Sequence, residues 1–238
     1  MSRAPSPAPS RRALLGLLFM AAGGVLFASK GLFAKALHME GVDYQTVTAL
    51  RALLALPLFA ALGIWRGAGL RSRATPRTVA LAALAGVLCY AIGAMVDFRA
   101  LEIIDVSLER ALLFTYPTLI VAWQSLVRRR WPRPAIMISL LLAYAGILLV
   151  VGVLDGDAWR GNRTGSLMVL GCAATTASYF LIGERCMPEL GSSGFTIIAM
   201  SAAAVVVCAV FLATHSLSVV AALTLHQWLL LAALAVLC

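Results

Sequence analysis

Four charged side chains within apolar stretches are the residues in this sequence that could most readily do chemistry. They are Lys30 in FASKGLF, Arg51 in TALRALL, and the adjacent Glu109 and Arg110 in SLERALL. A Lys or Arg at the centre of a bilayer costs roughly 2.5–3.5 kcal/mol on insertion scales, so we expect these groups to face a wet or paired interior. Lys30 lies about seven residues before the predicted end of the first helix at Leu37, and Arg51 about seven residues into the helix that begins at Tyr44, which is roughly 10 Å of helix in each case. Glu109 and Arg110 fall at a similar depth, so a single charged layer is predicted.

This layer supports one functional and one structural interpretation. The functional hypothesis is a charged ring that lines an outward-facing cavity and attracts substrates with a carboxylate or another anionic group. Glu109 would lie between cations, which lowers the cost of burying it, and it is the candidate group for coupling to protons. In the structural interpretation, the cations snorkel to the membrane surface or form a static ion pair between helices.

Other charged residues are predicted to lie at the periphery. We expect Lys35 to snorkel to the nearby interface. The junction between the third and fourth predicted spans is interpreted as a solvated outer edge, and it contains Asp97, Arg99, Glu102 and Asp105.

Hydroxyl-bearing residues within predicted spans complete the candidate substrate-binding set. They are Tyr90, Thr115, Tyr116 and Tyr179. A buried Tyr hydroxyl needs a hydrogen-bond partner, which is either water in a path through the protein or a group on another helix. Pro117 removes one helix hydrogen bond, which makes it either a hinge or a fixed kink.

Composition places these residues in a membrane protein. Hydrophobic residues make up 62% of the chain and charged residues 12%, compared with about 45–50% and about 25% in soluble domains. The apolar residues form repeated long runs, which predicts an all-α polytopic membrane protein. The net charge of +9 comes from arginines clustered between these runs. This pattern is a topology signal and argues against nucleic-acid binding.

The order of apolar runs predicts about seven full spans and part of an eighth. Residues 1–12 are expected to be a disordered cytoplasmic arm. The spans are expected at residues 13–37, 44–65, 78–98, 103–127 with Pro117 inside, 134–154, 165–183 and 195–214. A last run from His226 to Cys238 is too short to span a bilayer. We expect the chain to be cut inside an eighth helix, with a half-inserted terminal helix as the alternative.

Arginine placement predicts the orientation. The N-terminal segment and the linkers at residues 66–77 and 128–133 hold most of the arginines and would lie on the same side. This predicts a cytoplasmic N-terminus. With its Arg- and Ala-rich composition, the chain is expected in a bacterial inner membrane.

The sequence carries no motif for catalysis, a cofactor or a metal. Its five cysteines form no CxxC pair and its three histidines are not clustered, so we expect no disulfide framework or metal site. There is no GxSxG, HExxH or Walker loop. We therefore expect neither an enzyme nor an ATP-driven pump.

Sparse internal matches suggest a repeat. Gly41 corresponds to Gly191 and Thr46 to Thr196 at one common spacing. Ala28-Ser29 likewise echoes Ala177-Ser178. One repeat would then be the five helices of residues 13–154, followed by an incomplete second copy in residues 165–238. An odd number of helices inverts the second copy across the membrane.

The sequence contains, in this order, FASKGLFAKALHMEGVDYQTVTALRALLALP, LAGVLCYAIGAMVDFRALEIIDVSLERALLFTYPTLIV, LLLAYAGILLVV and GSLMVLGCAATTASYFLIGERCMPELGSSGFTIIAMSAAA. Together these stretches resemble EamA-type permeases of the drug/metabolite transporter superfamily over most of residues 20–205. The resemblance implies ten helices in two five-helix inverted repeats, and export or uptake of small metabolites. The chain departs from the family in holding RRR where members usually have a Gly-Glu-Arg-like end to helix 4. The resemblance also implies helices 9 and 10, which the expected spans of this sequence do not include.

The sequence thus predicts a secondary transporter of small metabolites, such as amino acids or related compounds, working by alternating access. The alternative is a non-transporting membrane fragment or a half-transporter subunit. The expected partners are a small-molecule substrate, the lipid bilayer and, through dimer pairing, a second copy of the chain.

Overall fold

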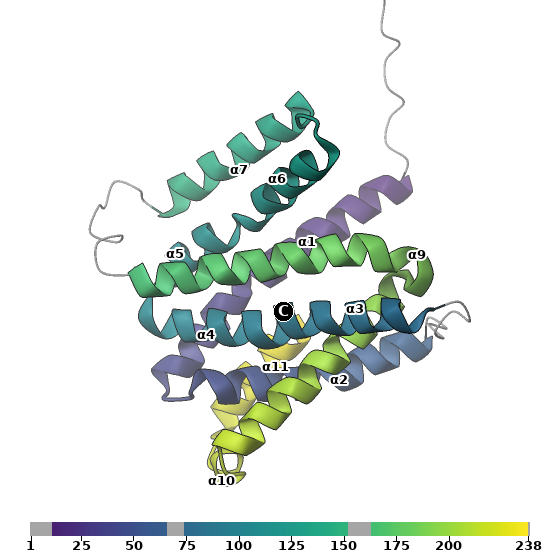
Figure 1. The fold of residues 1–238 in the computed structure, drawn as a ribbon. Helices are drawn as coiled ribbons and strands as arrows, with labels where there is room; N and C mark the ends of the chain where they lie inside the picture. Colours follow the sequence, from purple (N-terminus) through teal and green to yellow (C-terminus); the bar gives the residue numbers. More distant parts are fainter. Residues whose placement is uncertain (1–10, 66–73, 152–162, 238) are drawn as a thin grey trace, which may run out of the picture.

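The computed structural model describes residues 11–65, 74–151 and 163–237, and these residues form a helical bundle (Figure 1). Its helices are α1 (Arg11–Met39), α2 (Tyr44–Trp65), α3 (Pro76–Gly86), η1 (Val87–Gly93), α4 (Ala94–Ile103), α5 (Val106–Leu113), α6 (Tyr116–Arg128), α7 (Pro134–Val151), α9 (Arg163–Thr214), α10 (Ser218–Ala221) and α11 (Leu225–Leu237). The predicted disordered arm lies outside the described residues except for Arg11 and Arg12, which begin α1.

Four helical stretches among the described residues are long and apolar enough to span a membrane. They are Leu14–Met39, Tyr44–Ala61, Pro76–Ile103 and Arg163–Thr214. The described ranges contain no β-strand. The prediction of an all-α polytopic membrane protein is therefore confirmed, while its arrangement as two inverted repeats stays a prediction.

A short turn joins α1 and α2 and is fixed by two residues. Gly41 has φ of 81°, a conformation that glycine adopts without steric cost. Asp43 then caps α2, because its carboxylate accepts hydrogen bonds from the backbone N–H groups of Gln45 and Thr46, each at 3.0 Å. These bonds satisfy donors that the first helical turn leaves without partners. The two helices therefore form a hairpin.

A second glycine divides α9 into two arms, which Figure 1 shows folding back on each other. Gly191 has φ of 71° and ψ of 165°, which ends the first arm. The predicted helix at residues 165–183 is therefore longer than expected and continues to this glycine. Gly41 and Gly191, which the internal match pairs, both adopt positive φ.

The helix predicted over residues 103–127 is wrong as a single element. The long stretch from α3 through η1 to α4 continues to Ile103, and the chain is extended at Ile104, where φ is −118°. After α5, a break precedes α6, which begins at Tyr116 with Pro117 in its first turn. Proline is tolerated there because the N–H it lacks would have no helical partner. Pro117 therefore starts a helix instead of kinking one.

The packing of α3 against both arms of α9 forms one of the buried apolar clusters. Ala82 and Ala85 of α3 belong to one buried cluster with Tyr179 of the first arm and with Phe195 and Ala199 of the second. The approach is close because the adjoining residue of α3 is a glycine. A Cβ atom at Gly86 would overlap the backbone of Ala199. Small residues allow such close packing where lipid supplies no hydrophobic drive between helices.

We predict that Gly86→Ala destabilises the bundle. The added methyl group must push α3 away from α9, at a cost of roughly 1–3 kcal/mol. The matched control is Gly171→Ala in α9, where an added Cβ meets nothing within 4 Å. Thermal unfolding in detergent should show a lower melting temperature for Gly86→Ala alone. Equal melting temperatures for both variants would contradict this packing.

Candidate functional site: a cavity beside a buried charged layer

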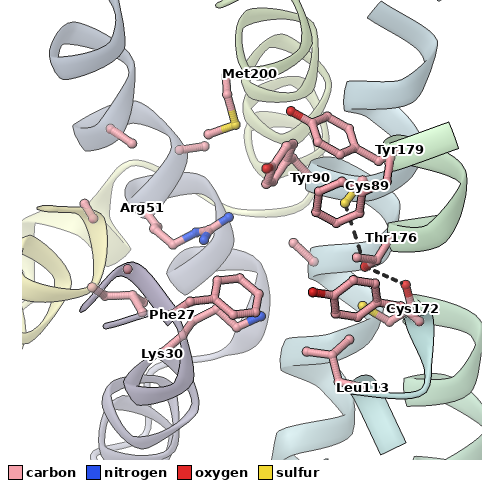
Figure 2. Close-up of a pocket in the computed structure, with 18 of the residues that line it drawn as sticks. Phe27, Lys30, Arg51, Cys89, Tyr90, Leu113, Cys172, Thr176, Tyr179 and Met200 are labelled. Atoms are coloured by element: carbon pink, nitrogen blue, oxygen red, sulfur yellow. Dashed lines mark hydrogen bonds between the residues drawn. The ribbon is translucent and has the colours of Figure 1, made fainter. Parts of the chain in front are cut away.

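A cavity of 460 Å³ lies inside the helical bundle, a size within the range of small-molecule pockets. Figure 2 shows it between α1 and α2 on one side and η1 and α9 on the other. One wall carries Lys30 and Arg51, and the opposite wall is aromatic. The described residues that line it include no Asp or Glu. The cavity surface is therefore apolar and aromatic, with positive charge on one wall.

The structure brings five of the eight predicted site residues to this cavity. The lining includes Lys30, Arg51, Tyr90, Tyr116 and Tyr179. The other three predicted residues, Glu109, Thr115 and Pro117, are not among its described lining residues. Pro117 instead lines an apolar groove against α7. Substrate binding by the five residues that line the cavity stays a prediction.

The π-helical segment η1 supplies two residues to the cavity wall, Cys89 and Tyr90. A π-helix inserts extra residues relative to an α-helix, which changes the direction of its side chains, and such segments are frequent at functional sites. The ring of Tyr90 meets the ring of Tyr179 edge to face, with centroids 5.0 Å apart. The sequence gives no periodic signal for this segment, so its geometry could not be predicted.

The aromatic wall continues along α9 to α6. Tyr179 contacts Phe180 edge to face at 5.7 Å between centroids, and Phe180 stacks on Tyr116 at 5.5 Å. Such pairs contribute about 0.5–1.5 kcal/mol beyond their buried area and hold rings in defined orientations. This wall can contact an apolar or aromatic part of a ligand.

The charged wall is anchored by an ion pair between α1 and α4. Lys30 Nζ lies 2.5 Å from Asp97 Oδ2. Asp97 has no exposed surface, so the prediction that it belongs to a solvated outer edge is wrong. The physical reason is that α4 continues to Ile103, which places Asp97 inside the span. Sequence reasoning missed Asp97, although the apolar residues on both sides of it were a usable signal.

Two cations share the faces of one aromatic ring. Lys30 Nζ lies 5.3 Å from the ring centroid of Phe98, and the guanidinium carbon of Arg51 lies 5.5 Å from it. Cation–π contacts at these distances contribute about 0.5–2 kcal/mol, depending on desolvation. Figure 2 shows the guanidinium of Arg51 directed into the space between the lining helices.

A second ion pair lies behind the cavity wall. Arg110 Nε lies 2.6 Å from Glu109 Oε2, and Glu109 has no exposed surface. The carboxyl groups of Glu109 and Asp97 are close enough to interact electrostatically. The predicted charged layer therefore contains two neighbouring carboxylates, with Lys30 as the cation that reaches from them to the cavity.

Lys35 and Arg99 were both predicted to lie at the periphery, and the structure bears this out differently for the two. Lys35 does not simply snorkel, because its ammonium donates to the backbone carbonyls of Leu101 at 2.8 Å and Ile104 at 3.2 Å. These carbonyls lie at the end of α4, where helical acceptors lack partners. Arg99 is exposed and pairs with Glu102, as expected of an outer edge.

No group of three or more His, Cys, Asp and Glu side chains is placed to hold a metal ion in the part of the chain that the structure describes. The described lining residues offer cations, hydroxyl groups and aromatic faces to a ligand.

Comparison with known proteins adds an independent observation. The model of the EamA-like transporter family matches residues 14–152. The uncharacterized transporter YcbK of Bacillus subtilis (strain 168) is 25% identical over 201 residues, which cover 84% of this chain and 64% of YcbK. The chain thus spans less than two thirds of the length of this relative. No solved structure matches the present chain.

We predict that Asp97→Asn destabilises the protein and that adding Lys30→Met recovers most of the loss. The single change leaves the Lys30 ammonium buried without its carboxylate, which costs roughly 3 kcal/mol or more. The double variant removes both charges together. Denaturant unfolding in lipid nanodiscs would measure the difference. A double variant less stable than Asp97→Asn alone would show that the two side chains do not act as a pair.

Proposed function

This chain belongs to the EamA-like transporter family, and we propose that it carries a small organic anion through the cavity between its helices. The proposed substrate has a carboxylate or another anionic group joined to an apolar or aromatic part, as in amino acids and related compounds. The observation that carries this proposal is the charge of the cavity wall. Lys30 and Arg51 line it, and its described lining residues include no carboxylate.

Electrostatics favour an anion at this wall. Attraction between opposite charges is several times stronger in a partly dehydrated protein site than in bulk water. The planar guanidinium of Arg51 can donate two parallel hydrogen bonds to a carboxylate. The rings of Tyr90, Tyr116 and Tyr179 supply contact for the remainder of the molecule. The cavity volume of 460 Å³ suits a compound of amino-acid size.

The described cavity wall has no carboxylate that could pair with the ammonium of a substrate, which favours substrates without a free ammonium group. A free amino acid carries an ammonium beside its carboxylate, and burying that ammonium unpaired is costly. Hydroxyl oxygens of Thr176 and the tyrosines can accept hydrogen bonds, but no carboxylate is described on the wall. Within the predicted class, we therefore propose that N-acylated amino acids and simple carboxylic acids bind better than free amino acids.

We further propose that transport proceeds by alternating access between two repeats, residues 13–154 and the repeat that begins near residue 165. The family match at residues 14–152 supports the first boundary. The positive φ angles of Gly41 and Gly191 support equivalent turns in the two repeats. Rocking of inverted repeats about a central site is the common mechanism of such transporters. The break before Pro117 is the proposed hinge, and the arginine distribution supports a cytoplasmic N-terminus in a bacterial inner membrane.

We predict that vesicles containing this protein bind and take up labelled N-acetyl-L-phenylalanine but not its uncharged amide. Arg51→Met should weaken binding about tenfold, the equivalent of roughly 1.4 kcal/mol. The matched control is Arg133→Gln, which removes an exposed arginine far along the chain from the cavity wall. Scintillation counting of labelled probe would measure binding and uptake.

Two outcomes would contradict the proposed function. One is normal affinity in a correctly folded Arg51→Met variant. The other is equal uptake of the acid and the amide, because the anionic group would then contribute nothing to recognition.

A further inference from the structure

We propose that Asp97 and Glu109 form a proton-binding site that is coupled to the substrate through Lys30. Each anion bound in the cavity would then be accompanied by one proton on this carboxyl pair. The inference rests on the proposed function, because it takes an anion in the cavity as its starting point.

Lys30 is the physical link between the two sites. Its ammonium lies 2.5 Å from Asp97 Oδ2, and the same residue lines the cavity. Asp97 itself is fully buried and is not among the described lining residues. Arg110 pairs with Glu109, so the ion-pair partner of Asp97 in the described structure is Lys30. An anionic substrate that engages Lys30 therefore withdraws positive charge from Asp97.

The carboxyl pair has acceptor oxygens with no donor. Asp97 Oδ1 and Glu109 Oε1 are buried and make no hydrogen bond among the described residues, whereas Glu109 Oε2 lies 2.6 Å from Arg110 Nε. The two carboxyl groups nevertheless interact with each other. A buried polar atom without a partner is costly. These oxygens can therefore accept a proton when an anion in the cavity engages Lys30.

Charged and titratable groups surround the carboxyl pair from every neighbouring helix. The positive groups are Lys30 from α1, Arg51 from α2 and Arg110 from α5, and the thiols are Cys89 from η1 and Cys172 from α9. Of these, Lys30 is the one that both contacts Asp97 and lines the cavity. The coupling is therefore assigned to Lys30.

The charge balance of the step is simple. The substrate brings one negative charge to Lys30, and water that enters the cavity delivers one proton to the carboxyl pair. No covalent bond of the substrate forms or breaks. The net charge of the layer is the same before and after loading. This matters because each uncompensated charge within the bilayer carries a large energetic cost.

The test is to count protons taken up as the probe binds. The 238-residue chain in nanodiscs, in weakly buffered solution with a pH-indicator dye, is titrated with N-acetyl-L-phenylalanine. We expect uptake of about one proton per bound probe, because binding and protonation are linked. Asp97→Asn should bind the probe without proton uptake. Glu184→Gln is the matched control, since it alters an exposed carboxylate, and it should behave like the unaltered protein.

A second variant, which lacks both the ammonium of Lys30 and the carboxylate of Asp97, tests the coupling even if Asp97→Asn misfolds. Lys30→Met combined with Asp97→Asn keeps the layer balanced, and any probe that it binds through Arg51 should carry no proton. Binding without proton uptake in the unaltered protein would overturn the coupling. Uptake that persists in Asp97→Asn or in the double variant would also overturn it.

A probe that does not bind would contradict the proposed function, and the coupling then has its own test. Lys30→Met removes the cation without any substrate. Infrared spectroscopy should then show a protonated carboxyl band that is absent from the unaltered protein and from the double variant. If Lys30→Met shows no such band, the coupling is wrong irrespective of the substrate.

Discussion

The ion pair between Lys30 and Asp97 is the interaction on which the arrangement of this membrane protein depends. An ammonium and a carboxylate within apolar helices must each find an opposite charge, because the bilayer offers none. Their contact at 2.5 Å fixes the position of α1 against α4. Phe98, the next residue in α4, then provides a ring that both Lys30 and Arg51 contact. Burial of one pair thus sets the direction of the cations that face the cavity.

Local irregularities in the helices position the other wall. The π-helical turns of η1 bring Tyr90 against Tyr179, and the reversal at Gly191 brings the second arm of α9 back along α3. The break before Pro117 places Tyr116 at the start of α6, where it stacks on Phe180. Straight helices alone would not place these aromatic rings together. The result is a cavity with positive charge on one wall and aromatic contact on the other, which suits an organic anion.

Residue depth along the predicted spans was enough to predict a charged layer, but not its pairing. Lys30 and Arg51 are each surrounded by apolar residues, whose run sets their predicted depth, and both line the cavity. Asp97 was missed because the third span was ended at residue 98. The helix continues to Ile103, where Lys35 of a different helix donates to the backbone carbonyls of Leu101 and Ile104. A contact from a different helix is not visible in the local sequence, so the apolar residues on both sides of Asp97 were the usable signal for this helix end.

The charge of the cavity can be measured directly through Cys89, which lines it. In a variant that keeps this cysteine alone, labelling rates are compared for an anionic sulfonatoethyl methanethiosulfonate and its cationic trimethylammonium analogue. Each rate is normalised to the reaction of free cysteine. Because the cavity wall carries cations, we expect the anionic reagent to label Cys89 faster than the cationic reagent. Faster labelling by the cationic reagent would contradict an anion-binding cavity.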